Sequence, residues 1–587
     1  MDSFIHPALF FILGAFLIPL LPGRIKKIYL LVIPAVAFLD VIYMSHGVYG
    51  EFRYLGFNII LGRVDRLSIV FAHVFTLMAF LGILYGLHVK EDGQLMSAFF
   101  YVGGSLGVVF AGDYLTVFIF WEMMAFASVF LIWYRKVPAS ISAGFRYLLM
   151  HIFGGLLLLA GIFLHYNNTG SLAFELIPKA GAGPAEYLIL AGFALNAAVF
   201  PLQAWLPDAY PEATVTGAVF MCAFTTKTAV YVLARAFPGY DILAVMGTAM
   251  TIYGVCYATI ENDMRRILSY HIISQVGYMV AGVGIGTELA INGASAHAYA
   301  HILYKALLFM GAGAILQMTG RSKLNELGGL YKYMPLSLIF YCVGGISISG
   351  FPLFSGFVSK SMIVAGAGEA HHPVLMVLML LASVGTFLSV GLKLPYFAWF
   401  GKDCGLRPKE PPRNMLWAMG LTSLLCFIIG VYPKVLYDLL PFPVHYQPYS
   451  GTHLSETIQI LLFTGLGFFL LLKRLTPEPK INLDFDWFYR AGVAGFMWLA
   501  RKPIQGFDSG WGELYRTVAL RIMMVLAAFF AWFDRWGIDG VVDNVAYGTR
   551  GVGHKLRLVQ SGNIQYYLGL ALVTFFIIIG VYLLLSF

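Results

Sequence analysis

The stretch that decides the fold is FPLQAWLPDAYPEATVTGAVFMCAFTTK, residues 200–227, in which three prolines and two carboxylates interrupt an apolar run. Apolar segments flank it on both sides, and the segment that follows carries Lys227. A bilayer has no water to satisfy a broken backbone, so such an interruption survives only where it is packed in protein or lines a wet cavity. Broken membrane helices beside ionisable groups are typical of ion transporters.

The composition indicates a membrane protein built of helices. The chain has 587 residues, of which 59% are hydrophobic and only 12% are charged, whereas soluble domains are nearer half apolar and a quarter charged. Apolar runs repeatedly reach the length needed to cross the hydrocarbon, and they predict roughly 16 crossings. A β-barrel would instead show short segments of alternating polarity. We therefore expect an all-α polytopic membrane protein.

The charged residues and the cysteines exclude several other classes. The net charge of +8 comes largely from short loops, and every second loop is basic. Because basic loops face the cytoplasm, this pattern predicts an external N-terminus. No basic run with interleaved aromatic residues indicates a nucleic-acid partner. The five cysteines are scattered without a CxxC or His/Cys ligand spacing. We expect no metal, cofactor or redox centre in this chain, and any oxidoreductase activity would belong to partner subunits.

The chain divides into six parts. A second long span, 334–368, contains Gly350, Pro352 and Gly356 and predicts a second broken helix. The two interruptions, VFPLQAWLPD and SGFPLFSGFVSK, echo each other and favour two related five-helix units. The expected parts are N-terminal transmembrane helices at 1–94, a first repeat at 95–235, a second repeat at 242–400, C-terminal core helices at 401–474, an amphipathic arm at 475–563 and an anchor helix at 564–587. The N-terminal segment lacks a basic n-region and is expected to be a spanning helix. The arm is either a tail folded on its own body or a lateral arm along neighbouring subunits.

Ionisable residues inside apolar spans are the candidate functional residues, because each is costly at that depth and needs a partner or water. Glu122 lies mid-helix among aromatic residues, and Lys227 follows the first interruption. A lone buried glutamate can also simply join two helices. Lys360 follows the second interruption, whereas Lys393 lies near the end of its span, where the side chain can reach the interface.

A column of ionisable residues recurs at four-residue spacing in HAYAHILYKALLF. His297, His301 and Lys305 therefore share one helix face. Histidine ordinarily titrates near pH 6.5, so the column is suited to relaying protons. The alternatives are a satisfied polar core or a metal site. A metal site is disfavoured because no carboxylate ligand lies nearby in the sequence.

Several motifs together resemble the antiporter-like subunits of respiratory complex I, of Mrp-type Na⁺/H⁺ antiporters (D and A types) and of energy-converting hydrogenase membrane arms. The motifs are FxxWExM around Glu122, PLQAWLPDAYPEA, TTKTAVY, DMRRILSYHIISQVGYM, HAYAHILYKALLF, GGLYKYMP and GFPLFSGFVSK. The tail, FDRWGIDGVVDNVAYGTRG followed by LVQSGNIQYYLGLALV, resembles the end of the distal complex I subunit, which bears a lateral helix and an anchor.

The resemblance implies a 14-helix core with two inverted five-helix repeats and a charged axis at mid-membrane. Glu122 and Lys227 would match the family's fifth-helix glutamate and eighth-helix lysine. His297, His301 and Lys305 would match its eleventh-helix relay, and Lys360 its twelfth-helix lysine. Additional candidates for the pathway or its lining are Asn196, His271, Lys393 and Asp208.

One residue departs from the family pattern. The family normally has a lysine in the seventh helix before the PLxxWLP motif, and this chain has Asn196 there. An amide can form hydrogen bonds but cannot carry a proton's charge. Glu122 therefore lacks its usual cationic partner. Either Lys227 takes over this pairing, or the first half-channel is altered or inactive.

The leading hypothesis is a proton-translocating, or Na⁺/H⁺-exchanging, subunit of a larger complex in a prokaryotic-type cytoplasmic membrane. Its partners would be other antiporter-like and small membrane subunits, together with a redox module in a respiratory or hydrogenase-type complex. The alternatives are a structural subunit that has lost pumping, which Asn196 favours, and a stand-alone transporter or the membrane partner of a bicarbonate-uptake system.

Overall fold

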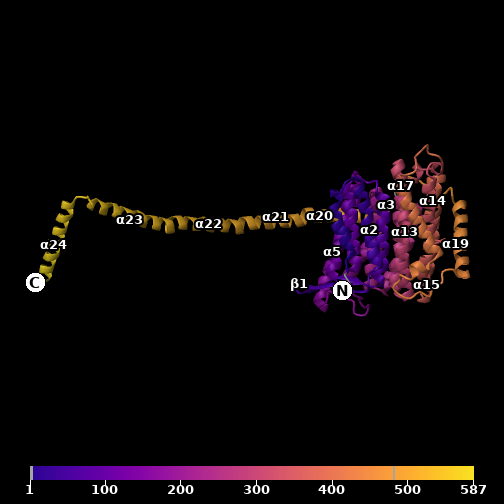
Figure 1. The fold of residues 1–587 in the computed structure, drawn as a ribbon, viewed down its shortest axis with the longest axis horizontal. Helices are drawn as coiled ribbons and strands as arrows, with labels where there is room; N and C mark the ends of the chain where they lie inside the picture. The colour runs from indigo at the N-terminus through magenta and orange to yellow at the C-terminus, as the bar shows by residue number, and fades with distance from the viewer. Residues whose placement is uncertain (1–3, 480–482, 587) are drawn as a thin grey trace. The chain divides into compact units, whose positions relative to one another are not determined.

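The computed structural model describes residues 4–479 and 483–586 and is mostly helical (Figure 1). It divides into two units, Met1–Asp486 and Trp487–Phe587. Among the described residues, 12 helices are long and apolar enough to cross a membrane, and two shorter apolar helices span Pro7–Leu20 and Pro335–Ser349. The chain is therefore a multi-pass membrane protein, as its composition predicted.

The first unit opens with helices and a β-hairpin. Its elements are α1 (Pro7–Leu17), α2 (Gly23–Ile42), β1 (Gly47–Tyr54), β2 (Phe57–Val64) and α3 (Arg66–Gly86). The strands pair antiparallel, and Tyr54 faces Phe57. Between them Leu55 and Gly56 have φ angles of 49° and 88°, as the two-residue loops of tight hairpins require. This hairpin departs from the prediction of an all-helical chain.

The next segment contains the first broken helix. Its elements are α4 (Asp92–Phe110), α5 (Tyr114–Trp133), α6 (Pro138–Thr169), α7 (Pro184–Asn196), α8 (Trp205–Ala209), α9 (Val215–Met221) and α10 (Thr225–Ala236). Helix α7 ends at Asn196, and the chain resumes a short helix only at Trp205. The predicted interruption is therefore present. A further break, which the sequence analysis missed, separates α9 from α10 at residues 222–224.

The second broken helix lies between α14 and α15. The elements here are α11 (Asp241–Ile260), α12 (Met264–Ile285), α13 (Glu288–Thr319), α14 (Pro335–Ser349), α15 (Ser355–Glu369) and α16 (Pro373–Thr386), which continues as π-helical turns to Phe400. Gly350 ends α14 with a φ of 74°, in the left-handed region that glycine adopts without strain. The predicted break at 334–368 is therefore observed.

Helices α6 and α13 correspond in detail. Both contain 32 residues, and α6 runs from 138 to 169 where α13 runs from 288 to 319, an offset of 150 positions. Each ends in a Thr-Gly pair whose glycine is left-handed. The flanking residues also match at this offset. An isolated β-bridge joins Asp113 to Ala173, and another joins Asp263 to Lys323. This is the relation expected of equivalent helices in two related units.

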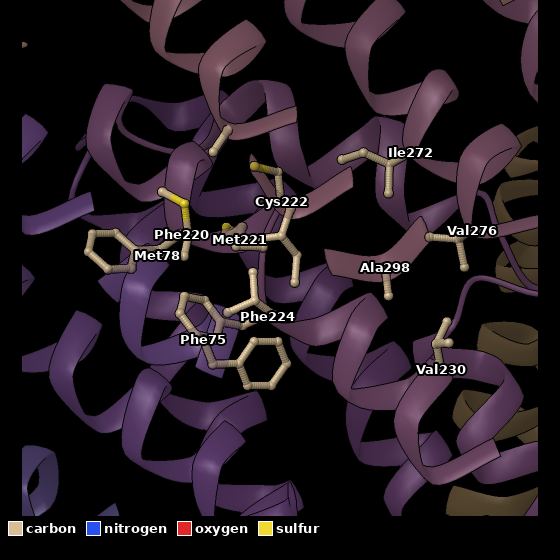
Figure 2. Packing of buried hydrophobic residues seen from close by; sticks show 14 of the residues in the cluster. Phe75, Met78, Phe220, Met221, Cys222, Phe224, Val230, Ile272, Val276 and Ala298 are labelled. Atoms are coloured by element: carbon tan, nitrogen blue, oxygen red, sulfur yellow. The ribbon is translucent and has the colours of Figure 1, made fainter. Parts of the chain in front are cut away.

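The centre of the first unit is a packed apolar core around α9 and α10. Phe75 and Met78 of α3 meet Phe220 and Phe224 there (Figure 2). Every residue from Thr216 to Ala236 is buried. In a bilayer such packing is driven by van der Waals contact rather than by the hydrophobic effect. The core therefore fixes the helix that carries Lys227.

The first unit ends with α17 (Arg413–Val431), α18 (Lys434–Tyr437) and α19 (Gly451–Leu470). The second unit is almost entirely helical, and its elements are α20 (Asp486–Leu499), α21 (Gln505–Leu514), α22 (Arg521–Phe533), α23 (Gly540–Val559) and α24 (Ile564–Ser586), the first four joined by π-helical turns. Residues 480–482 of the predicted arm lie outside the described residues. Helices α20 to α23 fall within residues 475–563, and α24 falls within residues 564–587.

Candidate functional site

Lys227 lies at the break between α9 and α10. Its side chain is fully buried. Its Nζ donates hydrogen bonds to the carbonyl of Cys222 at 2.7 Å and to Oγ1 of Thr226 at 3.0 Å. The break frees the carbonyl of Cys222, because the helix does not continue past it. The interruption thus provides the acceptor that holds the amine.

The three residues of the α13 column are buried and lie on one face, as the four-residue spacing predicted. Ring nitrogens of His297 lie 3.1 Å from Ser359 Oγ and 3.1 Å from Gln275 Oε1. Neither ring nitrogen of His301 nor the Nζ of Lys305 has a hydrogen-bond partner among the described residues. Buried polar groups of this kind normally bind ordered water. The unpartnered atoms of the column are therefore able to form hydrogen bonds with a chain of water molecules.

Lys360 lies at the second break. Its Nζ donates to the carbonyl of Ile348 at 3.2 Å and to Ser383 Oγ at 3.4 Å, and it lies 5.5 Å from the ring centroid of Tyr278. The carbonyl of Ile348 is free because α14 ends at the next residue. Lys227 and Lys360 are thus held in the same way, each by a carbonyl that a broken helix exposes.

A cavity of about 920 Å³ adjoins Lys360. It lies between α15, α16 and α19, and the ionisable residues His453 and Glu456 of α19 also line it. Lys360 thus borders an open space as well as the packed interior.

Glu122 occupies the middle of α5 without an ion-pair partner among the described residues. Its Oε1 is buried and has no hydrogen-bond partner within residues 4–479 and 483–586. The carboxylate lies directly against Gly155 of α6. Because the Lys227 amine is bound by Cys222 and Thr226, Lys227 does not pair with Glu122 in this structure. Pairing of Lys227 with Glu122, one of the two outcomes expected where the family lysine is absent, is therefore not observed.

His151 is an ionisable residue in an apolar span that was not among the predicted site residues. It lies on α6 with a side chain only 1% exposed, and Asn196 of α7 lies beside it. The ring packs against Tyr147 and Trp205, with centroid distances of 4.1 Å and 4.7 Å. Neither ring nitrogen forms a hydrogen bond of good geometry within the described part of the chain. A search for lone titratable residues in every apolar run would have found it.

The remaining candidates have structural surroundings of different kinds. Asp208 accepts two hydrogen bonds from Arg146, at 2.7 Å and 2.9 Å, which join α8 to α6. His271 lies 2.6 Å from Ser389 Oγ. Lys393 does not extend to the interface as expected, since it is only 2% exposed and donates to the carbonyls of Thr259 and Glu261. It binds the carbonyls that α11 leaves free at its C-terminus.

A group of buried hydroxyls lies near the start of α10, the helix that carries Lys227. Tyr147 lies 2.8 Å from Ser128 Oγ. The hydroxyl of Tyr101 lies 2.5 Å from Thr225 Oγ1 and accepts a hydrogen bond from the Thr225 backbone at 2.9 Å. Thr225 opens α10, two residues before Lys227. Buried hydroxyls therefore lie beside His151, at Tyr147, and at the start of the helix that carries Lys227.

Comparison with known proteins shows which family this chain resembles. Residues 111–388 match the family described as "NADH:quinone oxidoreductase/Mrp antiporter, TM". Over these residues the chain resembles this family. The matched segment contains every residue of the predicted pathway, from Glu122 to Lys360. Lys393 lies just beyond it.

Two relatives and one solved structure illustrate the similarity. It is 34% identical over 323 residues to the D-type subunit of a Na⁺/H⁺ antiporter from Alkalihalophilus pseudofirmus, and the match covers 52% of this chain and 65% of that protein. It is 29% identical to a probable A/B-type subunit of a K⁺/H⁺ antiporter from Rhizobium meliloti over 65% of this chain, but it spans only 41% of that relative. The fold matches a chain of respiratory complex I from Thermus thermophilus with a TM-score of 0.66 at 22% identity, covering 78% of this chain and 99% of the other.

Proposed function

We propose that this antiporter-like chain translocates protons as a membrane subunit of a larger complex. The observation that carries the proposal is the absence of carboxylate partners for three buried lysines. Lys227, Lys305 and Lys360 are each at most 5% exposed, and none forms an ion pair within the described ranges 4–479 and 483–586. Such groups are too costly to be retained as packing alone, and in membranes they mark ion paths.

The arrangement supports a relay of protons along the buried row. Lys305 lies close enough to Lys227 for their charges to interact, and His301 interacts with both. Like charges repel strongly in a medium of low dielectric constant, so the protonation states of neighbouring amines are coupled. Water bound at the unpartnered atoms of His301 and Lys305 would complete the connections between them.

The partners follow from the relatives and from the second unit. Both relatives compared above are named as subunits of cation/proton antiporters. Helices α20 to α24 expose large apolar side chains along their whole length, including Phe529, Phe530 and Trp532. Apolar surface of this extent is covered either by other subunits or by lipid. We place the complex in a prokaryotic-type cytoplasmic membrane, with protons as the transported ion and Na⁺ as the candidate exchanged ion.

The second candidate function is a structural subunit that does not pump. The exposed second unit favours a role in holding neighbouring subunits, and Asn196 removes a charge that the family normally has. Under this alternative, the buried lysines are remnants, and their replacement would leave ion transport by the complex unchanged. A role as the membrane partner in bicarbonate uptake has no further support from the geometry.

The experiment uses the native complex purified with its partners and reconstituted into lipid vesicles. Proton movement is followed with a pH-sensitive dye after addition of Na⁺, or of an electron donor where the partner subunits carry redox centres. Lys227→Ala and Lys305→Ala are compared with Lys473→Ala, whose residue lies in a loop. We expect each buried replacement to reduce transport at least about tenfold and the control to leave it unchanged. Wild-type transport in both buried variants would contradict the proposal.

A further inference from the structure

The first half of the chain contains a histidine whose position repeats that of a relay residue in the second half. At the 150-position offset between α6 and α13, His151 corresponds to His301. One turn before His151 the first half has Tyr147, and the second half has His297 at the corresponding position. One turn further along, Gly155 takes the place of Lys305.

The missing side chain at Gly155 is replaced by a group from another helix. The carboxylate of Glu122 lies where a side chain at Gly155 would begin, and a Cβ there would overlap its Oε1. The first half thus has a carboxylate one helical turn from His151, where the second half has the Lys305 amine one turn from His301. One turn corresponds to about 5.4 Å along the axis, a separation that one water molecule can bridge.

The surroundings of His151 contain polar atoms that the protein does not satisfy. Unpartnered buried atoms come from Glu122 on α5, from His151 itself and from Asn196 on α7. The groups facing the ring are Tyr147 on its own helix, Trp205 on α8 and Asn196 on α7. No charged side chain forms an ion pair with His151 in the part of the chain that the structure describes. Three helices therefore direct unsatisfied polar groups into one region, which is the condition for buried water.

We propose that His151 replaces the missing seventh-helix lysine as the proton-exchanging partner of Glu122. This inference rests on the proposed function and assigns the residue that keeps the first half active. The protonated carboxyl of Glu122 gives its proton, through a bridging water, to one ring nitrogen of His151. The other ring nitrogen releases its proton toward the broken segment at 197–204. Glu122 is left as a carboxylate, which takes up the next proton, and a flip of the ring restores its starting tautomer, so that one proton is moved in each cycle.

The exchange explains why an asparagine is tolerated at position 196. A lysine there would bring a second ionisable group next to the imidazole. An imidazole can be neutral at rest, which costs less in an apolar interior than an ammonium group does. Asn196 offers a donor and an acceptor beside the ring without adding charge. His151 and Asn196 together thus replace one lysine.

The test compares two histidines of the same helix in the reconstituted native complex. His151→Gln keeps a polar side chain but cannot take up a proton. His165→Gln is the matched control, since His165 contacts Glu186 at 2.8 Å near the other end of α6. We expect His151→Gln to lower proton transport at least about tenfold and to change its pH profile, whereas the control stays within about twofold. The thermal stability of each assembled complex shows whether the variant folds.

Two further variants make the outcome decisive. Restoring the family lysine with Asn196→Lys in the His151→Gln background is expected to recover transport, which a purely structural histidine would not allow. Wild-type transport and an unchanged pH profile in His151→Gln would overturn the inference. A large gain from Asn196→Lys with His151 intact would also overturn it, because it would show an inactive first half. If Lys305→Ala abolishes transport together with either of these two results, the inference about His151 fails but the proposed function of the chain is still supported.

Discussion

The carboxylate of Glu122 lies against the backbone of Gly155, on the turn of α6 that corresponds to the turn of α13 bearing Lys305. A glycine at this position is a requirement of the contact, since any Cβ would occupy the space of Oε1. The acidic group of the first half and the basic group of the second half therefore occupy equivalent places on two equivalent helices.

Gly155→Ala is expected to displace the Glu122 carboxylate and to lower proton transport by the reconstituted complex several-fold. The reason is steric, since Ala is a good helix former and only its contact with Glu122 is unfavourable. Gly465→Ala, at a glycine of α19 with open space around it, serves as the control. Combining Gly155→Ala with Glu122→Gln should add little to either single effect, and full additivity would argue against coupling between the two residues.

Lys227 and Lys305 are expected to differ in their contributions to stability. Lys227→Met removes hydrogen bonds to Cys222 and Thr226, and we expect a loss of about 1–3 kcal/mol. Lys305→Met removes an amine that has no hydrogen-bond partner among the described residues and replaces it with a side chain of similar volume, so stability should be unchanged or higher. Thermal unfolding of the purified complex measures both. Equal destabilisation by the two replacements would be inconsistent with these contacts.

Asp484 is expected to anchor the segment that follows α19. Its carboxylate accepts hydrogen bonds from Tyr253 of α11 and Tyr270 of α12, and the residue is buried. Asp484→Ala leaves two tyrosine hydroxyls unpaired and should cost about 1–3 kcal/mol. We expect faster cleavage of residues 471–479 by added protease, and Asp508→Ala, at an exposed site, should cleave at the wild-type rate.

Asp65 precedes α3, outside the membrane-spanning segments, and its carboxyl makes the stability of the protein depend on pH. Burial acts to raise the pKa of Asp65, but hydrogen bonds from Arg235 and the Arg235 charge outweigh it and hold the pKa below its usual value. A lowered pKa in the folded state stabilises the protein above the unfolded pKa of about 3.9, and this contribution is lost as the pH falls. We expect the melting temperature of wild type to fall more than that of Asp65→Asn between about pH 5 and pH 3. Parallel curves for the two proteins would contradict this.

Most of the candidate site could be predicted because it depends on spacing along a helix. His297, His301 and Lys305 share a face for geometric reasons alone, and the prolines around residues 201 and 352 mark the two breaks in the helices. The sequence could not give the acceptors of the buried amines. Lys227 is held by the carbonyl of Cys222, which is free only because α9 ends early in a segment without proline.

The missed features depend on contacts between distant segments. His151 gains its meaning from Glu122 and Asn196, which lie on other helices, and from the match between α6 and α13. The hairpin at 47–64 carries too little apolar alternation to stand out beside much longer apolar spans, and only its Leu-Gly turn marks it. Lys393 was expected at the interface because of its position near a span end, but the free carbonyls of α11 bind it inside.

The most direct test of the central claim is proton transport by vesicles that contain the complex with Lys305→Met. This variant removes the unpartnered amine at the centre of the buried row and is expected to leave the fold and the assembly intact. If protons pass along this row, transport falls at least about tenfold while the complex keeps its wild-type melting temperature or exceeds it. Wild-type transport by an assembled Lys305→Met complex would contradict the account.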